Sequence, residues 1–163
     1  MSLSIPENNS FPQPAGINFS LKEPIPIRSL SQSLCMIASF LQNVLHETKL
    51  VQYEDWWQHD GLHFRRGECN IHDLFSMIGT PRELMSTMQG DEYVHVGIAP
   101  PDTSWYLRFY ETWDDEGQEM IGRFDITLRE DDAKRFRESV VSEFEFTVLE
   151  QNATDYYKRI IVS

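Results

Sequence analysis

An alternation of apolar and polar residues between positions 104 and 128 limits the fold of this chain more than any other feature. Successive side chains of a β-strand point to opposite faces, so an alternation of period two predicts a strand with two chemically different faces. The clearest example is 104–113, where one face would carry Trp105, Leu107 and Phe109, and the other Tyr106, Arg108 and Tyr110.

Two further strands are predicted on either side of this one, at Tyr93–Ala99 and Gln118–Leu128. Pro100-Pro101-Asp102 separates the first pair, and Asp114-Asp115-Glu116-Gly117 separates the second. Connections this short join antiparallel strands, because a parallel pair needs a crossover of a dozen or more residues. We therefore expect an antiparallel meander.

Helical periodicity precedes and follows the meander. Apolar residues recur every three or four positions over 29–48, where Ser29 and Gln32 have the spacing of a capping box. A second helix is predicted over Glu130–Ser142, because its first turn is acidic and Ala133 begins an apolar stripe. Shorter helices are expected over 71–78 and 80–89.

The predicted fold class is α+β: an antiparallel sheet of about five strands with helices packed mainly on one face. Phe144–Glu150 and Tyr156–Val162 are the remaining predicted strands, and the aromatic stretch 51–69 is expected to be irregular. Residues 1–27 contain five prolines and are predicted to form an N-terminal arm. Within it, the alternation of apolar and polar residues over 17–21 indicates an edge strand. Residues 28–163 would form a single domain.

Charge limits the classes of partner. The 163 residues carry a formal charge of −12, and residues 91–163 hold 17 acids and 8 bases, a net −9. Nucleic-acid binding needs clustered Lys and Arg, so it is not expected. No apolar run reaches the roughly 18 residues that cross a bilayer, and the sequence begins without the pattern of a secretory signal, so no membrane association and a cytoplasmic location are expected.

One candidate catalytic arrangement is built on a cysteine. Cys35 follows Gln32 near the start of the predicted first helix, where the helix dipole would acidify a thiol and Gln32 could donate to an oxyanion. His95 and Asp102 follow as a base and its orienting group. This order is similar to that of papain-like cysteine peptidases. The alternative is a structural thiol on the flank of a core helix, with Gln32 acting as a capping residue.

A second candidate is a zinc site. His59, His63, Cys69 and His72 place four ligands of the types that zinc prefers within 14 residues. Gly61 argues against one shared helical face, and the spacings do not match a standard zinc finger. Solvated loop histidines and a small buried cysteine explain the same residues, so neither a metal nor another cofactor is expected.

The third candidate is a binding surface on the sheet. If helices cover only the Trp105 face, Tyr106 and Tyr110 are exposed beside Arg108, a composition frequent in binding surfaces. The acidic turn Asp114-Asp115-Glu116 would extend it. The alternative is a sheet covered on both faces, with the arm or the Trp56-Trp57 segment over these tyrosines.

These patterns favour a non-enzymatic module that binds a basic partner protein through its sheet and acidic turns. The size, charge and aromatic sheet resemble those of small bacterial immunity or inhibitor proteins, a resemblance of composition and architecture without a diagnostic motif. The alternatives are a cysteine- or zinc-dependent hydrolase, and a small-molecule sensor with a pocket between the Trp56-Trp57 segment and the sheet.

Overall fold

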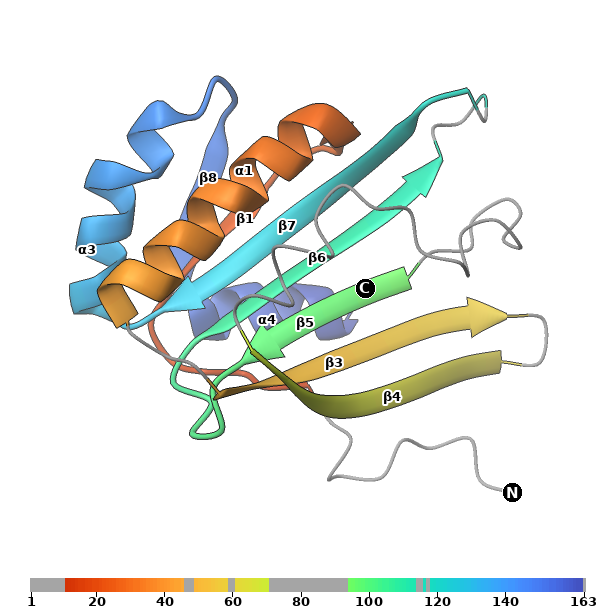
Figure 1. Ribbon diagram of the computed structural model, residues 1–163, viewed down its shortest axis with the longest axis horizontal. Coiled ribbons are helices and arrows are strands. Elements are labelled where there is room, and N and C mark those ends of the chain that lie inside the picture. Colours follow the sequence, from red (N-terminus) through yellow and green to blue (C-terminus); the bar gives the residue numbers. More distant parts are fainter. Residues whose placement is uncertain are drawn as a thin grey trace.

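A computed structural model describes residues 11–45, 49–58, 61–70, 94–113, 116 and 118–162. Among these residues, the centre is an eight-stranded antiparallel sheet in which seven strands follow the order β4-β3-β5-β6-β7-β1-β8 (Figure 1). The short β2 also pairs with β7. The strands are β1 (Ile17–Leu21), β2 (Ile25–Pro26), β3 (Lys49–Gln58), β4 (Gly61–Asn70), β5 (Val94–Ala99), β6 (Tyr106–Trp113), β7 (Met120–Leu128) and β8 (Val148–Asn152). The helices are α1 (Ile27–Phe40), continued by a π-helical turn (Leu41–Leu45), α3 (Glu130–Ser139), continued by a 3₁₀ turn (Val141–Glu143), and α4 (Ala153–Val162).

The predicted meander is confirmed. Strands β5, β6 and β7 pair antiparallel in chain order, with Val96 opposite Phe109 and Phe109 opposite Phe124. The α+β class is confirmed as well. The predicted strand count is too low, because the described part of the chain forms a sheet of eight strands rather than about five.

One face of the sheet, here called the apolar face, forms the main core with α1 and α3. Leu34 and Ile37 of α1 and Phe136 of α3 belong to the same buried cluster as Leu107 and Ile126 of the sheet. Helix α1 crosses β7 at Gly122, where an added Cβ would lie 2.6 Å from Leu30 Cδ2 and would overlap the Tyr110 carbonyl oxygen. A glycine at this position therefore allows the helix to lie directly on the strand.

The predicted first helix is confirmed, but its start differs. It begins at Ile27 with Pro26 at the N-cap position, and no side chain caps it. Ser29 is inside the helix, where its carbonyl oxygen accepts a hydrogen bond from Ser33 Oγ at 2.7 Å. The proposed capping box of Ser29 and Gln32 is therefore wrong.

For two segments the structure differs from the sequence prediction. Residues 51–58 and 61–69 are regular: β3 and β4 pair along their whole lengths, from Lys49 with Asn70 to Gln58 with Gly61. Residues 156–162 form the helix α4 and not a strand. Asn152 begins this helix, because its Oδ1 accepts a hydrogen bond from the Thr154 backbone N–H at 2.9 Å.

Strand β1 is interior rather than an edge strand, because it pairs with β7 on one side and with β8 on the other. The strand predicted over 144–150 begins and ends later in the chain than expected, and it is β8, Val148–Asn152. The short helices predicted over 71–78 and 80–89 lie outside the described residues. Within the described part of the chain, no helix is long and apolar enough to cross a membrane.

Candidate functional site

The second face of the sheet, here called the polar face, carries buried polar side chains beside smaller hydrophobic clusters. Asn18, Thr127 and Asp125 are 0%, 0% and 7% exposed. Asn18 Nδ2 donates to Thr127 Oγ1 at 2.9 Å, and the Tyr157 hydroxyl of α4 donates to the same oxygen at 2.8 Å. Helix α4 is thus attached to this face through hydrogen bonds, which satisfy groups that would be costly to bury alone.

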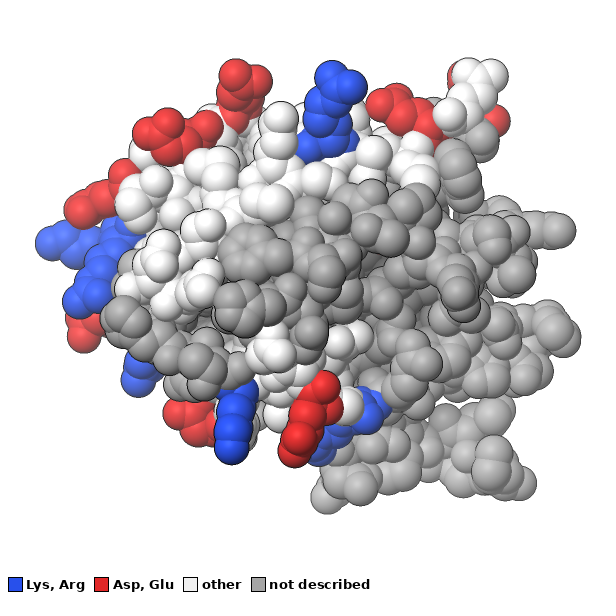
Figure 2. Space-filling view, in the orientation of Figure 1, with Lys and Arg blue, Asp and Glu red and all other residues white. Residues whose placement is uncertain are grey.

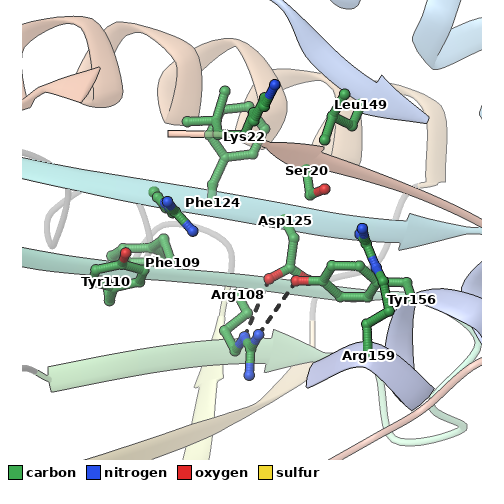
Figure 3. Close-up of a pocket in the computed structure, with 12 residues that line it drawn as sticks. Ser20, Lys22, Arg108, Phe109, Tyr110, Phe124, Asp125, Leu149, Tyr156 and Arg159 are labelled. Atoms are coloured by element: carbon green, nitrogen blue, oxygen red, sulfur yellow. Dashed lines mark hydrogen bonds and ion pairs between the residues drawn. The ribbon is translucent and has the colours of Figure 1, made fainter. Parts of the chain in front are cut away.

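An ion pair lies at the centre of this face. Arg108 on β6 is directly opposite Asp125 on β7, and its Nε donates to Asp125 Oδ2 at 3.2 Å. Arg108 Nη2 also donates to the Tyr156 hydroxyl of α4 at 3.4 Å. Figure 3 shows these three side chains meeting from two strands and a helix.

Burial controls the protonation of the groups around this pair. Burial by itself would lower the pKa of Arg108, but the charge of Asp125 and the neighbouring tyrosines raise the pKa well above its ordinary value. Burial also raises the pKa of Tyr156. At neutral pH the site therefore contains a guanidinium cation and a neutral tyrosine hydroxyl.

The structure does not expose the predicted tyrosine pair. Tyr106 is 2% exposed, and its ring lies over Gly97, where an added Cβ would overlap the hydroxyl. Tyr53 packs edge-on against it with ring centroids 6.1 Å apart, and Phe11 of the N-terminal arm packs on the same cluster. The expectation that Tyr106 is exposed is therefore wrong, because Tyr53 and Phe11 of the arm pack on this part of the polar face.

Tyr110 and Arg108 are half-buried rather than fully covered. Tyr110 is opposite His95 of β5, and their rings pack edge to face with centroids 5.1 Å apart. Of the acidic turn, Glu116 is exposed, whereas Asp114 and Asp115 lie outside the described residues.

A cavity of about 480 Å³ opens on the polar face between the sheet and α4. Arg108 and Asp125 belong to its sheet wall, Tyr156 and Arg159 to its α4 side, and Lys22 follows β1 (Figure 3). Arg123 of β7 also lines the cavity. A smaller cavity of about 200 Å³ also reaches Arg108 and Asp125 and is lined by Phe11 and Tyr157. The ion pair thus contributes to the walls of both cavities.

The sequence does not predict several of these residues. No motif includes Arg123, and the pattern over Tyr156–Val162 predicts a strand, whereas Tyr156 and Arg159 lie on helix α4. The alternation over 118–128 places Arg123 and Asp125 on the strand face opposite Phe124. This alternation predicts that Arg123 and Asp125 share a face of the sheet. The sensor hypothesis placed a pocket beside Trp56 and Trp57, whereas the larger cavity lies beside α4.

The residues of the candidate peptidase site are not brought together. Cys35 is an exposed free thiol eight residues after the start of α1. It lies on the side of the apolar face, while His95 pairs with Tyr110 on the polar face. Asp102 is in an exposed turn, where hydrogen bonds from Ser104 lower its pKa. Gln32 is exposed.

The candidate zinc residues are described only in part. Cys69 lies on β4 and packs against the main hydrophobic cluster. His63 also lies on β4, while His59 and His72 lie outside the described residues. Within the described ranges, no three His, Cys, Asp or Glu side chains are grouped to hold a metal ion.

Comparisons with protein-family models, with curated proteins and with solved structures gave no match to this chain.

Proposed function

We propose that this protein is a non-enzymatic binding module that docks a basic partner protein. One observation carries the proposal: a pair of half-buried aromatic rings is surrounded by exposed carboxylates on one part of the surface. We call this the acidic–aromatic patch and define it as Glu138, Glu143, Phe144, Glu145 and Phe146.

The charge of the patch has one sign. Residues 138–150 contain four glutamates and no lysine or arginine. Glu150 is paired with Arg137 at 2.7 Å, whereas Glu138, Glu143 and Glu145 are exposed. Figure 2 shows acidic side chains over the end of α3 and the loop that leads to β8.

The aromatic part of the patch is held in place from below. Phe144 and Phe146 stack with their centroids 4.9 Å apart and their planes at 19°. The ring centroid of Phe144 also lies 5.8 Å from that of Phe124 on β7, so the Phe144–Phe146 pair packs on the main core. Aromatic anchors with a charged rim are typical of protein-binding surfaces, where the rim accelerates association and the anchors slow dissociation.

The patch replaces the tyrosines of β6 as the proposed anchors, because Tyr106 is buried. The acidic turn at 114–116 stays part of the proposal through its exposed residue, Glu116. Small immunity and inhibitor proteins that neutralise basic toxins or nucleases remain the functional class that this combination of size and charge favours.

The test starts from a partner captured from native lysate, identified and then purified, since capture alone does not support the proposal. Surface plasmon resonance then compares the double variant Glu143→Gln/Glu145→Gln with the matched control Glu23→Gln/Glu68→Gln, whose residues are exposed elsewhere. The patch variant should reduce the association rate by roughly threefold to tenfold at low salt, and the reduction should shrink at high salt. Phe146→Ala should mainly increase the dissociation rate.

Equal association rates for the two double variants would remove the patch as a docking site. A partner with a net negative charge would contradict the proposed function itself.

A further inference from the structure

The larger cavity on the polar face has a charge opposite to that of the protein. Among the described residues, its lining includes four basic residues, Lys22, Arg108, Arg123 and Arg159, and one carboxylate, Asp125. The formal charge of these described residues is therefore +3, in a chain whose total charge is −12. Basic residues are the minority in this chain, so their convergence on one cavity is not explained by solubility.

Only one of these cations is matched by the carboxylate. Arg108 takes Asp125 as its ion-pair partner. Arg159 Nη2 donates at 2.6 Å to Gln151 Oε1, which is a neutral acceptor. Arg123 Nε is buried and has no hydrogen-bond partner among the described residues. Because a buried donor without an acceptor is costly, Arg123 is a position where a ligand oxygen would be stabilising.

The strand register brings these groups close to one another. Arg123 lies two residues before Asp125 on β7, so both face the cavity, and Arg108 is directly opposite Asp125. Arg123 and Arg108 are therefore diagonal neighbours, and such neighbours lie about 7–8 Å apart between Cα atoms. An oxyanion between two guanidinium groups at this spacing can accept hydrogen bonds from both.

The cavity also supplies neutral donors and an apolar wall. The Tyr156 hydroxyl, which accepts from Arg108, lies on the α4 side of the cavity, and Ser20 contributes a second hydroxyl. Leu149 of β8 adds apolar surface. A volume of about 480 Å³ is within the range of small-molecule sites.

From these features we propose that the cavity between β1, β6, β7 and α4 binds a small organic oxyanion, whose carboxylate or phosphate group is held by Arg123 and Arg108. The cavity lies on the opposite face of the sheet from the acidic–aromatic patch, so this site does not depend on the proposed partner protein. It would give a negatively charged protein a selective site for a negatively charged metabolite.

The test uses the full chain with citrate and inorganic phosphate as separate probes, each at constant ionic strength maintained with sodium chloride. Isothermal titration calorimetry should show saturable binding of at least one probe. Binding of citrate alone identifies a carboxylate ligand, and binding of phosphate alone identifies a phosphate ligand. Glycerol, a neutral molecule, should give no saturation.

Two variants locate the site. Arg123→Gln should weaken binding at least tenfold, because it removes a charge-assisted hydrogen bond. The matched control Arg135→Gln removes one positive charge from an exposed position on α3 and should leave the affinity within about twofold. Arg159→Gln, at an exposed position of α4, provides a second cavity variant if Arg123→Gln does not fold, as judged by circular dichroism.

The proposal is overturned if neither probe saturates, or if the cavity variants and Arg135→Gln bind equally well. Loss of anion binding in the cavity variants with unchanged binding of a basic partner would separate this site from the docking function.

Discussion

Arg108 and Asp125 lie directly opposite each other on β6 and β7, with Arg108 Nε 3.2 Å from Asp125 Oδ2. Their side chains are 20% and 9% exposed, so the pair is held largely out of water. It joins the central strands of the sheet to α4 through Tyr156 and contributes to the walls of both cavities on the polar face.

Asp125→Asn should destabilise the protein by about 3 kcal/mol, because it leaves the Arg108 guanidinium partly buried without a counter-charge. Urea denaturation followed by circular dichroism measures the change. Glu119→Gln, an exposed site just before β7, is the matched control and should shift stability by no more than about 0.5 kcal/mol. Similar results for the two variants would show that the ion pair adds little to stability.

Gly97→Ala should destabilise the protein by about 1–3 kcal/mol, because the new methyl group would overlap the Tyr106 ring in the β3–β5–β6 part of the sheet. Gly67→Ala on β4 is the control, since nothing lies within 4 Å of its added Cβ. Thermal unfolding compares the two variants. An unchanged melting temperature for Gly97→Ala would contradict the close packing of Tyr106 on this glycine.

The stability of the fold should decrease in alkaline solution as Tyr157 ionises. Burial raises the pKa of Tyr157 to about 12, above the ordinary value of 10.0. The folded state therefore holds this proton more tightly than the unfolded state. The stabilisation is complete below pH 10 and is lost between pH 10 and about 12, on the order of 2 kcal/mol.

Tyr157→Phe is the test of this pH dependence, because it cannot ionise. Its stability should decrease less steeply than that of the wild type over the same pH range, measured by urea denaturation at each pH. Parallel curves would assign the alkaline loss to other groups.

Cys35 should react with iodoacetamide in the native protein before Cys69 does. Cys35 is exposed on α1, whereas Cys69 is half-buried and packs against the main cluster. Mass spectrometry of peptides at increasing reaction times gives the order of labelling. Earlier modification of Cys69 would show that β4 opens more readily than its packing indicates.

Leu41→Ala should cost about 2–5 kcal/mol, because Leu41 is 1% exposed and belongs to the main core. Chemical denaturation measures the loss, with Gln32→Ala on the exposed side of α1 as the control. A cost below about 1 kcal/mol would place the end of this helix outside the cooperative core.

The elements that could be predicted are those whose side-chain pattern is complete within the element. The stripe of Leu30, Leu34 and Ile37 defines a helix wherever its apolar side is buried, and Leu107 and Phe109 define a strand face in the same way. Connections of a few residues then required antiparallel pairing of β5, β6 and β7.

The elements that could not be predicted depend on partners far away in the sequence. Residues 156–162 are rich in aromatic and β-branched residues, which favour a strand, yet they form α4 because Asn152 provides a helix start and Tyr157 reaches Thr127. Strand β1 is interior only because it pairs with β7 and β8. Asn18 of β1 is paired with Thr127 and Gln151, each more than 100 residues later in the sequence.

The candidate sites divide in the same way. The sequence by itself determined the negative charge, its concentration after residue 90 and the two-sided strand at 104–113. Only the tertiary structure decided that Tyr106 is buried. It also decided that four basic residues, which lie on or next to β1, β6, β7 and α4, line one cavity. Burial and convergence are set by what packs against a residue, and that information is spread over the whole chain.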